Sequence, residues 1–144
     1  MKKVAHILDA KGRDVWAVTP DTRVAEALAM MADKNCGALL VLSEGNIAGI
    51  VSERDYARRV EPEGKTAAGT LVSEIMTVDV EYVDPEQTAE ECLALMTESY
   101  FRHLPVLADG ELAGIVSIGD VVKAVIEEQG FVIEQLHRYI TGGA

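Results

Sequence analysis

The sequence contains few cysteines and aromatic residues, less positive than negative charge, and no long apolar run. Its two cysteines, Cys36 and Cys92, are far apart and form no C-x-x-C pair, so neither a disulfide scaffold nor a structural zinc site is expected. No apolar stretch approaches the roughly 18 residues of a membrane-spanning helix. The apolar residues after the first two lysines are interrupted by His6 and Asp9, so a signal peptide is not expected either.

Acidic residues exceed basic ones: the chain has 13 Lys and Arg residues and 24 Asp and Glu residues, which give a formal net charge of -11. This balance repels nucleic-acid polymers and anionic membranes, so we expect neither as a partner. Hydrophobic residues make up 49% and charged residues 26% of the 144 residues, which is typical of a folded globular protein of about one domain. A reducing, cytoplasmic location is the default expectation.

The chain consists of two similar halves, 65 residues apart. A shift of this size places Glu26-x-Leu28-Ala29-x-Met31 on Glu91-x-Leu93-Ala94-x-Met96. It also places the Gly-x-x-Ala-Gly-Ile-Val-Ser-x-x-Asp segment of residues 45–55 on the same pattern at residues 110–120. A match of this length without a gap exceeds what shared periodicity produces. The sequence therefore predicts a tandem of two like units.

The first half of each unit is predicted to be an extended piece followed by a helix. The extended piece stops at Pro20 or Pro85, because proline disfavours helix in the residue before it. In the second unit Thr88-Ala89-Glu90-Glu91 is a capping box at the start of an amphipathic helix. The first unit lacks the box, since Arg23 stands where Thr88 does, although Glu26 is kept.

The second half of each unit is predicted to be a β-hairpin and a further helix. Two short apolar runs surround a glycine-bearing turn at Ser43-Glu44-Gly45-Asn46, and the helix begins at Ser52 or Ser117. Each unit is therefore β-α-β-β-α, in a mixed α/β (α+β) fold. Because one such unit cannot bury both faces of its hairpin, we expect the units to pair about a pseudo-two-fold axis, with two equivalent clefts between them.

This repeat, with Gly-Ile-Val-Ser-x-x-Asp closing each hairpin, resembles the cystathionine-β-synthase (CBS) domain pair, or Bateman module. The resemblance covers nearly the whole chain and is sharpest at residues 49–56, 101–106 and 114–123. The chain looks like the stand-alone single-pair proteins that carry no enzyme domain. The resemblance implies a non-catalytic regulatory module without a catalytic cofactor. It also implies a homodimer of CBS pairs and clefts that bind adenosine-containing ligands such as AMP, ADP, ATP, NAD(H) or S-adenosylmethionine.

The predicted organisation follows chain order. Residues 1–62 form the first CBS repeat, with a short N-terminal helix around residues 4–8, and residues 63–71 form a polar linker. Residues 72–130 form the second repeat, and residues 131–144 form a C-terminal amphipathic helix and tail that ends at Thr141-Gly142-Gly143.

The Ser-x-x-Asp motif supports two interpretations. A helix that begins directly after a strand presents free backbone N–H groups to a phosphate, and a carboxylate in its first turn suits the two hydroxyls of a ribose. Asp55 and Asp120 are placed for this role. The same motif is also a variant of the capping box, in which Ser and Asp only satisfy the helix N-terminus. The two roles are compatible.

The motif and the resemblance together define a predicted ligand-binding set. Adenine is expected beside the extended segments at Val18-Thr19 and Val83-Asp84, with the aspartates on ribose. The resemblance implies a phosphate contact for Arg102, for which the first repeat has only Gly37, while His103 is either a site residue or a partly covered hairpin residue. The predicted set is Thr19, Gly37, Ala38, Ser52, Arg54, Asp55, Val83, Arg102, His103, Pro105, Ser117, Ile118 and Asp120.

The two predicted sites differ in charge. Arg54, with Arg58 and Arg59 one turn further along, offers guanidinium groups to a ligand with two phosphates or to a dinucleotide, whereas Gly119 leaves the second site suited to a monophosphate. The alternative is that these arginines form a solvated helix face.

Two further classes of function compete with a ligand sensor. An enzyme would need a nucleophile with an activating base, and Cys36 has no such base nearby in sequence, so a small buried thiol is the better interpretation. A protein-interaction scaffold with weak or no nucleotide binding would use the C-terminal helix to contact a second pair or a protein target of unknown identity. The alternative for that helix is packing within the chain or completion of a dimer.

Overall fold

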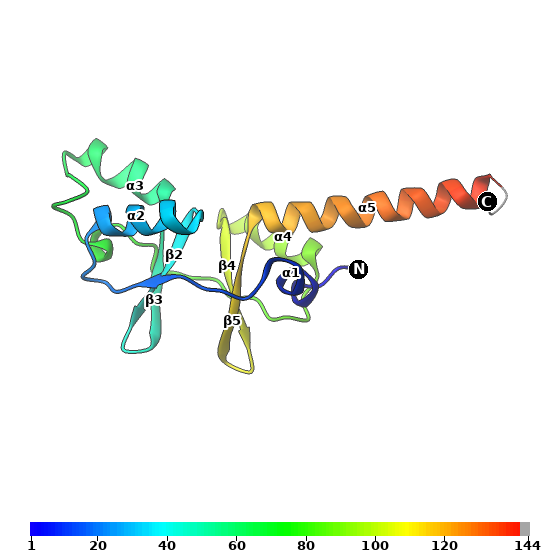
Figure 1. The fold of residues 1–144 in the computed structure, drawn as a ribbon, viewed down its shortest axis with the longest axis horizontal. Helices are drawn as coiled ribbons and strands as arrows, with labels where there is room; N and C mark the ends of the chain where they lie inside the picture. The colour runs from blue at the N-terminus through cyan, green and yellow to red at the C-terminus, as the bar shows by residue number, and fades with distance from the viewer. Residues whose placement is uncertain (142–144) are drawn as a thin grey trace. The chain divides into compact units, whose positions relative to one another are not determined.

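A computed structural model describes residues 1–141 of the chain. The chain folds into two compact units (Figure 1). One unit comprises Val15–Val80, and the other combines Met1–Asp14 with the chain from Glu81 onward. The mixed α+β architecture with two like repeats confirms the predicted fold class.

The Val15–Val80 unit contains a three-stranded sheet in the order β1-β2-β3. The short strand β1 (Ala17–Val18) runs parallel to β2 (Ala38–Ser43), which forms an antiparallel hairpin with β3 (Asn46–Ser52). Helix α2 (Val24–Lys34) precedes the hairpin and α3 (Glu53–Arg59) follows it. Two 3-10 turns, η1 (Glu61–Glu63) and η2 (Val72–Glu74), complete the unit.

The other unit repeats this order on a two-stranded sheet. Helix α4 (Ala89–Ser99) precedes the hairpin of β4 (His103–Ala108) and β5 (Glu111–Ser117), and α5 (Ile118–Ile140) follows it. The extended piece predicted before α4 makes only a single parallel bridge, between Val83 and Val106. The unit also contains the N-terminal helix α1 (Val4–Lys11).

Both hairpins turn through two residues with positive φ. Glu44 and Gly45 have φ of 51° and 81°, and Asp109 and Gly110 have φ of 53° and 82°. Such turns match the right-handed twist of the flanking strands, and glycine adopts this conformation without steric cost. The four-residue turns predicted from the sequence are therefore present at the same place in both repeats.

Each unit is completed by the segment that precedes the other repeat in the chain. Helix α1 lies before the first repeat, yet Val4, Ile7 and Leu8 are buried in one core with Leu104 and Val116 of the second hairpin. Likewise Val72 and Ile75, from the start of the predicted second repeat, are buried in the core of the Val15–Val80 unit. Chain order alone assigned α1 to residues 1–62 and residues 72–80 to the second repeat, whereas packing of the apolar side chains places each with the other hairpin.

The segment after η2 lies so close to strand β3 that one position of the hairpin, residue 49, must be glycine. Thr77 pairs with Ile50 at the open edge of β3, with N···O distances of 2.8 and 3.0 Å. A Cβ atom on the neighbouring Gly49 would come within 2.5 Å of the Thr77 carbonyl oxygen. Gly49 therefore allows the segment after η2 to lie directly against the strand.

Helix α5 is one continuous helix of 23 residues. The sequence predicts that the second repeat ends at residue 130 and a separate helix follows, but the structure has no break in the helix at Gly130. One glycine inside a helix costs only about 1 kcal/mol, which a long helix tolerates. The helix ends at Ile140, where the Thr141 N–H donates to the His137 carbonyl oxygen. The predicted end at Gly142 and Gly143 lies outside the described residues.

Candidate functional site at two strand-to-helix junctions

The Ser-x-x-Asp motif of the Val15–Val80 unit forms a reciprocal cap at the start of α3. The Asp55 N–H donates to Ser52 Oγ at 3.2 Å, and the Ser52 N–H donates back to Asp55 Oδ2 at 2.9 Å. The other carboxylate oxygen, Oδ1, lies 3.4 Å from the hydroxyl of Thr77, which donates to it. The capping role is thus present, and it uses mainly one oxygen of Asp55.

The same cap recurs at the start of α5, with an added cation. The Ser117 N–H donates to Asp120 Oδ2 at 2.8 Å, and the Asp120 N–H donates to Ser117 Oγ at 3.2 Å. Lys11, at the end of α1, brings its ammonium nitrogen to 2.6 Å from the same Asp120 oxygen and 3.0 Å from the Ile115 carbonyl oxygen. Asp120 therefore carries an ion pair, whereas Asp55 meets a neutral hydroxyl.

The first residues of the hairpin lie beside each junction. In strand register Ala38 is opposite Ser52, and His103 is opposite Ser117. The residues before the strands are joined to the helices by backbone hydrogen bonds, with Gly37 O accepting from Glu53 N at 3.1 Å. The matching bond, from Ile118 N to Arg102 O, measures 2.8 Å. The structure thus gathers most of the predicted set into one site per unit, which consists of Gly37, Ala38, Ser52, Arg54 and Asp55 in one unit and of Arg102, His103, Ser117, Ile118 and Asp120 in the other.

Three predicted residues lie elsewhere. Thr19 follows β1, whose register with β2 places it toward the hairpin turn, four positions and roughly 13 Å along the strand from Ala38. Val83 is buried in the core, and its N–H and C=O are bonded to Pro105 O and Leu107 N. Pro105 is buried beside it. The structure therefore gives Val83 and Pro105 a packing role and leaves no free polar backbone group on Val83 for adenine.

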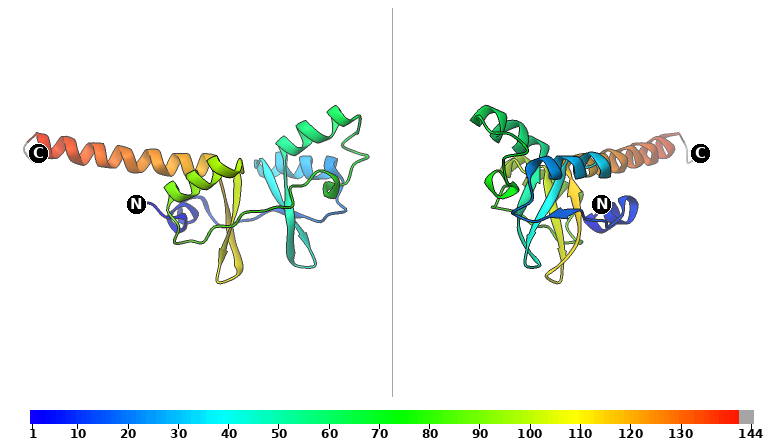
Figure 2. Two further views of the ribbon diagram at one scale, coloured as in Figure 1. Left: turned by 180° about the vertical axis from the view of Figure 1, so that it is seen from behind. Right: turned by 60° about the vertical axis from the view of Figure 1, so that its left-hand side comes forward.

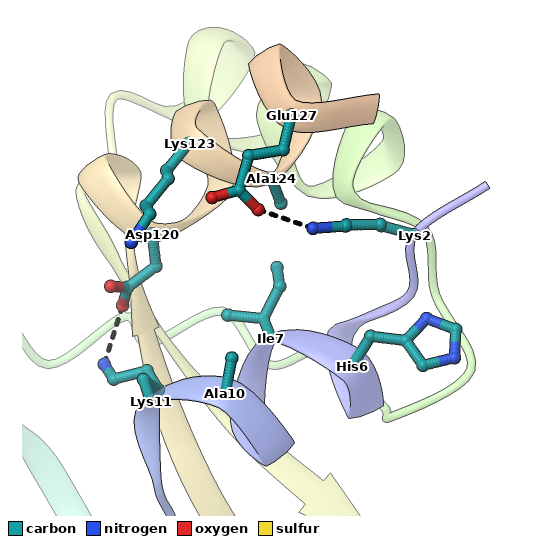
Figure 3. Close-up of a pocket in the computed structure, with 9 residues that line it drawn as sticks. All are labelled: Lys2, His6, Ile7, Ala10, Lys11, Asp120, Lys123, Ala124 and Glu127. Atoms are coloured by element: carbon teal, nitrogen blue, oxygen red, sulfur yellow. Dashed lines mark hydrogen bonds and ion pairs between the residues drawn. The ribbon is translucent and has the colours of Figure 1, made fainter. Parts of the chain in front are cut away.

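A pocket of about 130 Å³ lies beside Asp120, between α1 and α5 (Figure 3). Two ion pairs bound it, Lys11 with Asp120 and Lys2 with Glu127, the latter at 2.5 Å. Ile7 of α1 points between the two pairs toward α5. The pocket is small, apolar at its base and charged at its rim.

The charges around this pocket act on one another. Burial opposes ionisation of Asp120, but hydrogen bonds from Lys11 and from Ser117, with the positive charge of Lys11, outweigh it and hold the pKa of Asp120 below its ordinary value. Burial also lowers the pKa of His103, the charges of Lys11 and Arg102 lower it further, and Asp120 opposes them. Asp120 is therefore ionised and His103 neutral at pH 7.

The cations predicted for the other site are dispersed. Arg54 and Arg58 are exposed on α3, and Arg59 donates to the Ile75 carbonyl oxygen at 3.2 Å, which ties η2 to the helix. A cavity of about 380 Å³ lies beside Gly37 and Glu53, and half-buried Cys36 contributes to its wall. Arg59 thus has a structural contact, while Arg54 is the arginine nearest to the Ser52–Asp55 cap in sequence.

Sequence reasoning missed Lys11 and Thr77, the two side chains that contact the paired aspartates. Both precede a repeat in chain order, and each contacts the repeat that it does not precede. The repeat alignment carried a partial signal, because it places Thr77 on Gly12, next to Lys11. It could not show that these segments cross to the other hairpin.

The described residues contain no cluster suited to metal binding, and the Cys92 thiol is not activated. No group of three His, Cys, Asp or Glu side chains within residues 1–141 is placed to hold a metal ion. Burial raises the pKa of the Cys92 thiol to about 11, so it stays protonated and unreactive. In the same part of the chain, no helix combines the length and the apolarity that crossing a bilayer requires.

The family model of the CBS domain matches residues 7–62 and 72–127. The chain therefore belongs to the CBS domain family, as its sequence motifs indicated. CBS domain proteins are generally regulatory modules without catalytic activity, and no catalytic family is indicated for this chain.

Relatives match the chain over most of its length. The CBS domain-containing protein CBSX3, a mitochondrial protein of Arabidopsis thaliana, is 37% identical over 97% of this chain and 72% of its own. A solved structure of a protein with CBS domains from Burkholderia ambifaria is 52% identical, with a TM-score of 0.86 over 89% of this chain and 96% of its own. The CBS domain pair of protein MJ0100, in complex with 5′-methylthioadenosine and S-adenosylmethionine, shares the fold at 22% identity. Its TM-score is 0.76 over 89% of this chain and 98% of its own.

Proposed function

We propose that this chain is a regulatory sensor that binds adenosine-containing nucleotides, AMP, ADP, ATP or NAD(H), at the two strand-to-helix junctions. The observation that carries the proposal is the repetition of one arrangement, in which an aspartate held by a serine cap lies at a helix start beside the first residues of a hairpin. A cap that only stabilises a helix does not need a hairpin beside it. Thr88 and Glu91, for example, cap α4 at a helix start that does not follow a hairpin strand.

The chemistry of the paired aspartates suits a ribose. A carboxylate accepts several hydrogen bonds at once, and each cap uses mainly one oxygen, Oδ2. The other oxygen remains for a hydroxyl: Asp55 Oδ1 already accepts one from Thr77. The backbone N–H groups at the helix start add affinity for a phosphate. The MJ0100 complex supports the proposal because its shared fold accommodates two adenosine ligands.

The two sites are proposed to differ in the ligand they prefer. Arg54 is exposed beside the Ser52–Asp55 cap, and the site offers the larger cavity, which favours a ligand with two phosphates or a dinucleotide. At the other site Lys11 pairs with Asp120, Arg102 and neutral His103 begin the hairpin beside the helix start, and the pocket is smaller, which favours a monophosphate. Lys11 contacts Oδ2 of Asp120, so a ribose hydroxyl on Oδ1 competes with its ammonium for the charge of the same carboxylate, and the ammonium is close enough to serve the phosphate.

Thermal unfolding with AMP, ADP, ATP, NAD and S-adenosylmethionine tests the proposal. A ligand at 100 times its Kd adds about 2.7 kcal/mol of stability, a shift of several degrees in Tm for a protein of this size. Asp55→Asn and Asp120→Asn should each remove the shift at one site, because the amide keeps the shape of the side chain and loses the charge. Asp109→Asn, in the β4–β5 turn where φ is 53°, is the matched control and should keep both shifts.

A scaffold function is the second candidate, and the exposed apolar side chains of α5 favour it. In that case the protein regulates a partner as a homodimer, with weak or no nucleotide binding. The absence of any Tm shift with all five ligands would select the scaffold over the sensor. Under either function, we propose a homodimer of CBS pairs in a reducing, cytoplasmic compartment, which thiol-bearing Cys36 and Cys92 tolerate.

A further inference from the structure

The second half of α5 is exposed on every side. The figures show its last turns extending beyond α1 and α4 of its own unit (Figures 1 and 2). Every residue from Gln129 to Thr141 is exposed, including Ile133 at 66%, Leu136 at 56% and Ile140 at 80%. The family model ends at residue 127, so this segment lies outside both CBS repeats. An isolated helix of about 12 residues is marginal in water, so a segment of this kind needs a partner surface to be stable.

The exposed apolar residues follow a heptad pattern. Isoleucine occupies every first position, at 126, 133 and 140, and Leu136 occupies the fourth position of the last heptad. β-Branched residues at the first position with leucine at the fourth favour a parallel two-stranded coiled coil. We name this stripe the α5 seam, and its members are Val122, Ile126, Gln129, Ile133, Leu136 and Ile140.

Gln129 is the polar member of the seam, and it favours a second copy of the same helix as the partner. In a parallel, in-register pair the two Gln129 side chains face one another, and an amide both donates and accepts hydrogen bonds. A polar residue of this kind is satisfied by its own counterpart and sets the register. An antiparallel pair would place it against a different residue.

The charges on α5 also favour a second copy over a lipid surface. Glu127, Glu128 and Glu134 lie outside the seam, and Glu134 forms an ion pair with Arg138 of the same helix at 3.1 Å. The positions flanking the seam, at Val132, His137 and Tyr139, bring no like charges together in a parallel pair. Helices that lie on membranes carry lysine and arginine on the polar face instead.

We propose that two copies of this chain associate through the α5 seam as a short, parallel, in-register coiled coil. The contact involves roughly 27 Å of helix between Val122 and Ile140, so it is weak alone and depends on protein concentration. It is independent of nucleotide binding, because it uses none of the residues at either candidate site.

The first test compares two glutamate substitutions of equal charge and similar exposure. Ile133 belongs to the seam, whereas Phe131, at 61% exposure, points about 180° away from it around the helix. Sedimentation of the full chain over a concentration series should show that Ile133→Glu weakens association at least tenfold and that Phe131→Glu has the affinity of the parent. Equal affinity of the parent and Ile133→Glu, or equal loss in both variants, would overturn the proposal, and so would a monomeric parent at all concentrations.

The second test addresses orientation. Mild oxidation should cross-link Gln129→Cys into a dimer, because the fourth heptad position brings the two side chains together in a parallel pair. Phe131→Cys should remain uncross-linked, and the parent, with Cys36 and Cys92, gives the background. Cross-linking of Phe131→Cys as fast as Gln129→Cys would contradict the in-register parallel pair. Neither variant is expected to fail to fold, since both side chains are exposed in the structure.

Discussion

The Lys11 ammonium lies 2.6 Å from the Asp120 carboxylate, whereas the matching carboxylate of the other repeat, Asp55, accepts a hydrogen bond from the neutral Thr77 hydroxyl at 3.4 Å. Each repeat thus holds its aspartate in the same kind of cap, but the groups that face the two aspartates differ. A ribose at Asp120 would share its carboxylate with a cation, while a ribose at Asp55 would meet only the neutral hydroxyl of Thr77 beside the cap. This difference makes the two sites chemically distinct before any ligand binds.

Replacing Lys11 should expose its competition with ribose. Lys11→Met removes an ion pair that contributes about 0.2 to 1 kcal/mol, so adenosine, which lacks a phosphate, should bind up to about fivefold tighter at the Asp120 site. AMP should gain less, because it loses the cation for its phosphate, and isothermal titration with both ligands measures the ratio. Lys65→Met is the control, since Lys65 has the same exposure and pairs with Glu63 and Glu74. Unchanged affinity for both ligands in Lys11→Met would show that Lys11 does not compete with ribose for Asp120.

Stability should fall as the pH drops below 6.5, with His103 as one source. Its pKa in the folded protein lies below 6.5, because of burial first and of Lys11 and Arg102 next, with Asp120 opposing them. The unfolded chain therefore binds the proton first. The stability from neutral His103 is complete above pH 6.5 and is lost as the pH falls toward the pKa of the folded protein.

Urea unfolding at several pH values measures this dependence. His103→Gln should flatten the curve just below pH 6.5, and His137→Gln on exposed α5 is the control. An equal slope in the parent and in His103→Gln would contradict the assignment to His103.

Helices α2 and α4 occupy equivalent positions in the two repeats but differ in their N-terminal caps, and a substitution should give α2 the cap of α4. Thr88 accepts a hydrogen bond from the Glu91 N–H, whereas Arg23 makes no side-chain cap on α2. Thr88→Ala should cost about 1 kcal/mol of unfolding free energy, and Arg23→Thr should add up to about 1 kcal/mol by forming the box with Glu26. Urea unfolding checks both values. Destabilisation by Arg23→Thr would mean that the arginine has a role that the structure does not show.

Two glycines should respond to alanine with opposite sign. Gly49→Ala places a Cβ 2.5 Å from the Thr77 backbone oxygen and should destabilise the protein by about 1 to 3 kcal/mol. A Cβ on Gly130 meets nothing within 4 Å, so Gly130→Ala should stabilise α5 by about 0.5 to 1 kcal/mol. Thermal unfolding of the two variants beside the parent measures both. Equal effects would contradict the close approach at Gly49.

Local features were largely predictable from the sequence. The capping boxes at Ser52, Thr88 and Ser117 involve residues three positions apart, so their spacing alone identifies them. The two hairpins were predicted because their glycine-bearing turns repeat at a fixed distance. The α5 seam was recognised only as an amphipathic tail, because its exposure depends on where the rest of the unit ends.

The sequence by itself determined the repeat, the family and the positions of the two aspartates, because these depend on residue identity and short spacing. The tertiary structure decided what faces each aspartate. Burial of apolar side chains carries α1 to the second hairpin and the segment after η2 to the first, and no local rule predicts such an exchange. Lys11 therefore reaches Asp120 across more than a hundred residues of chain. Positive charge is scarce in this chain, and the fold places one of its few lysines against the aspartate of a candidate ligand site.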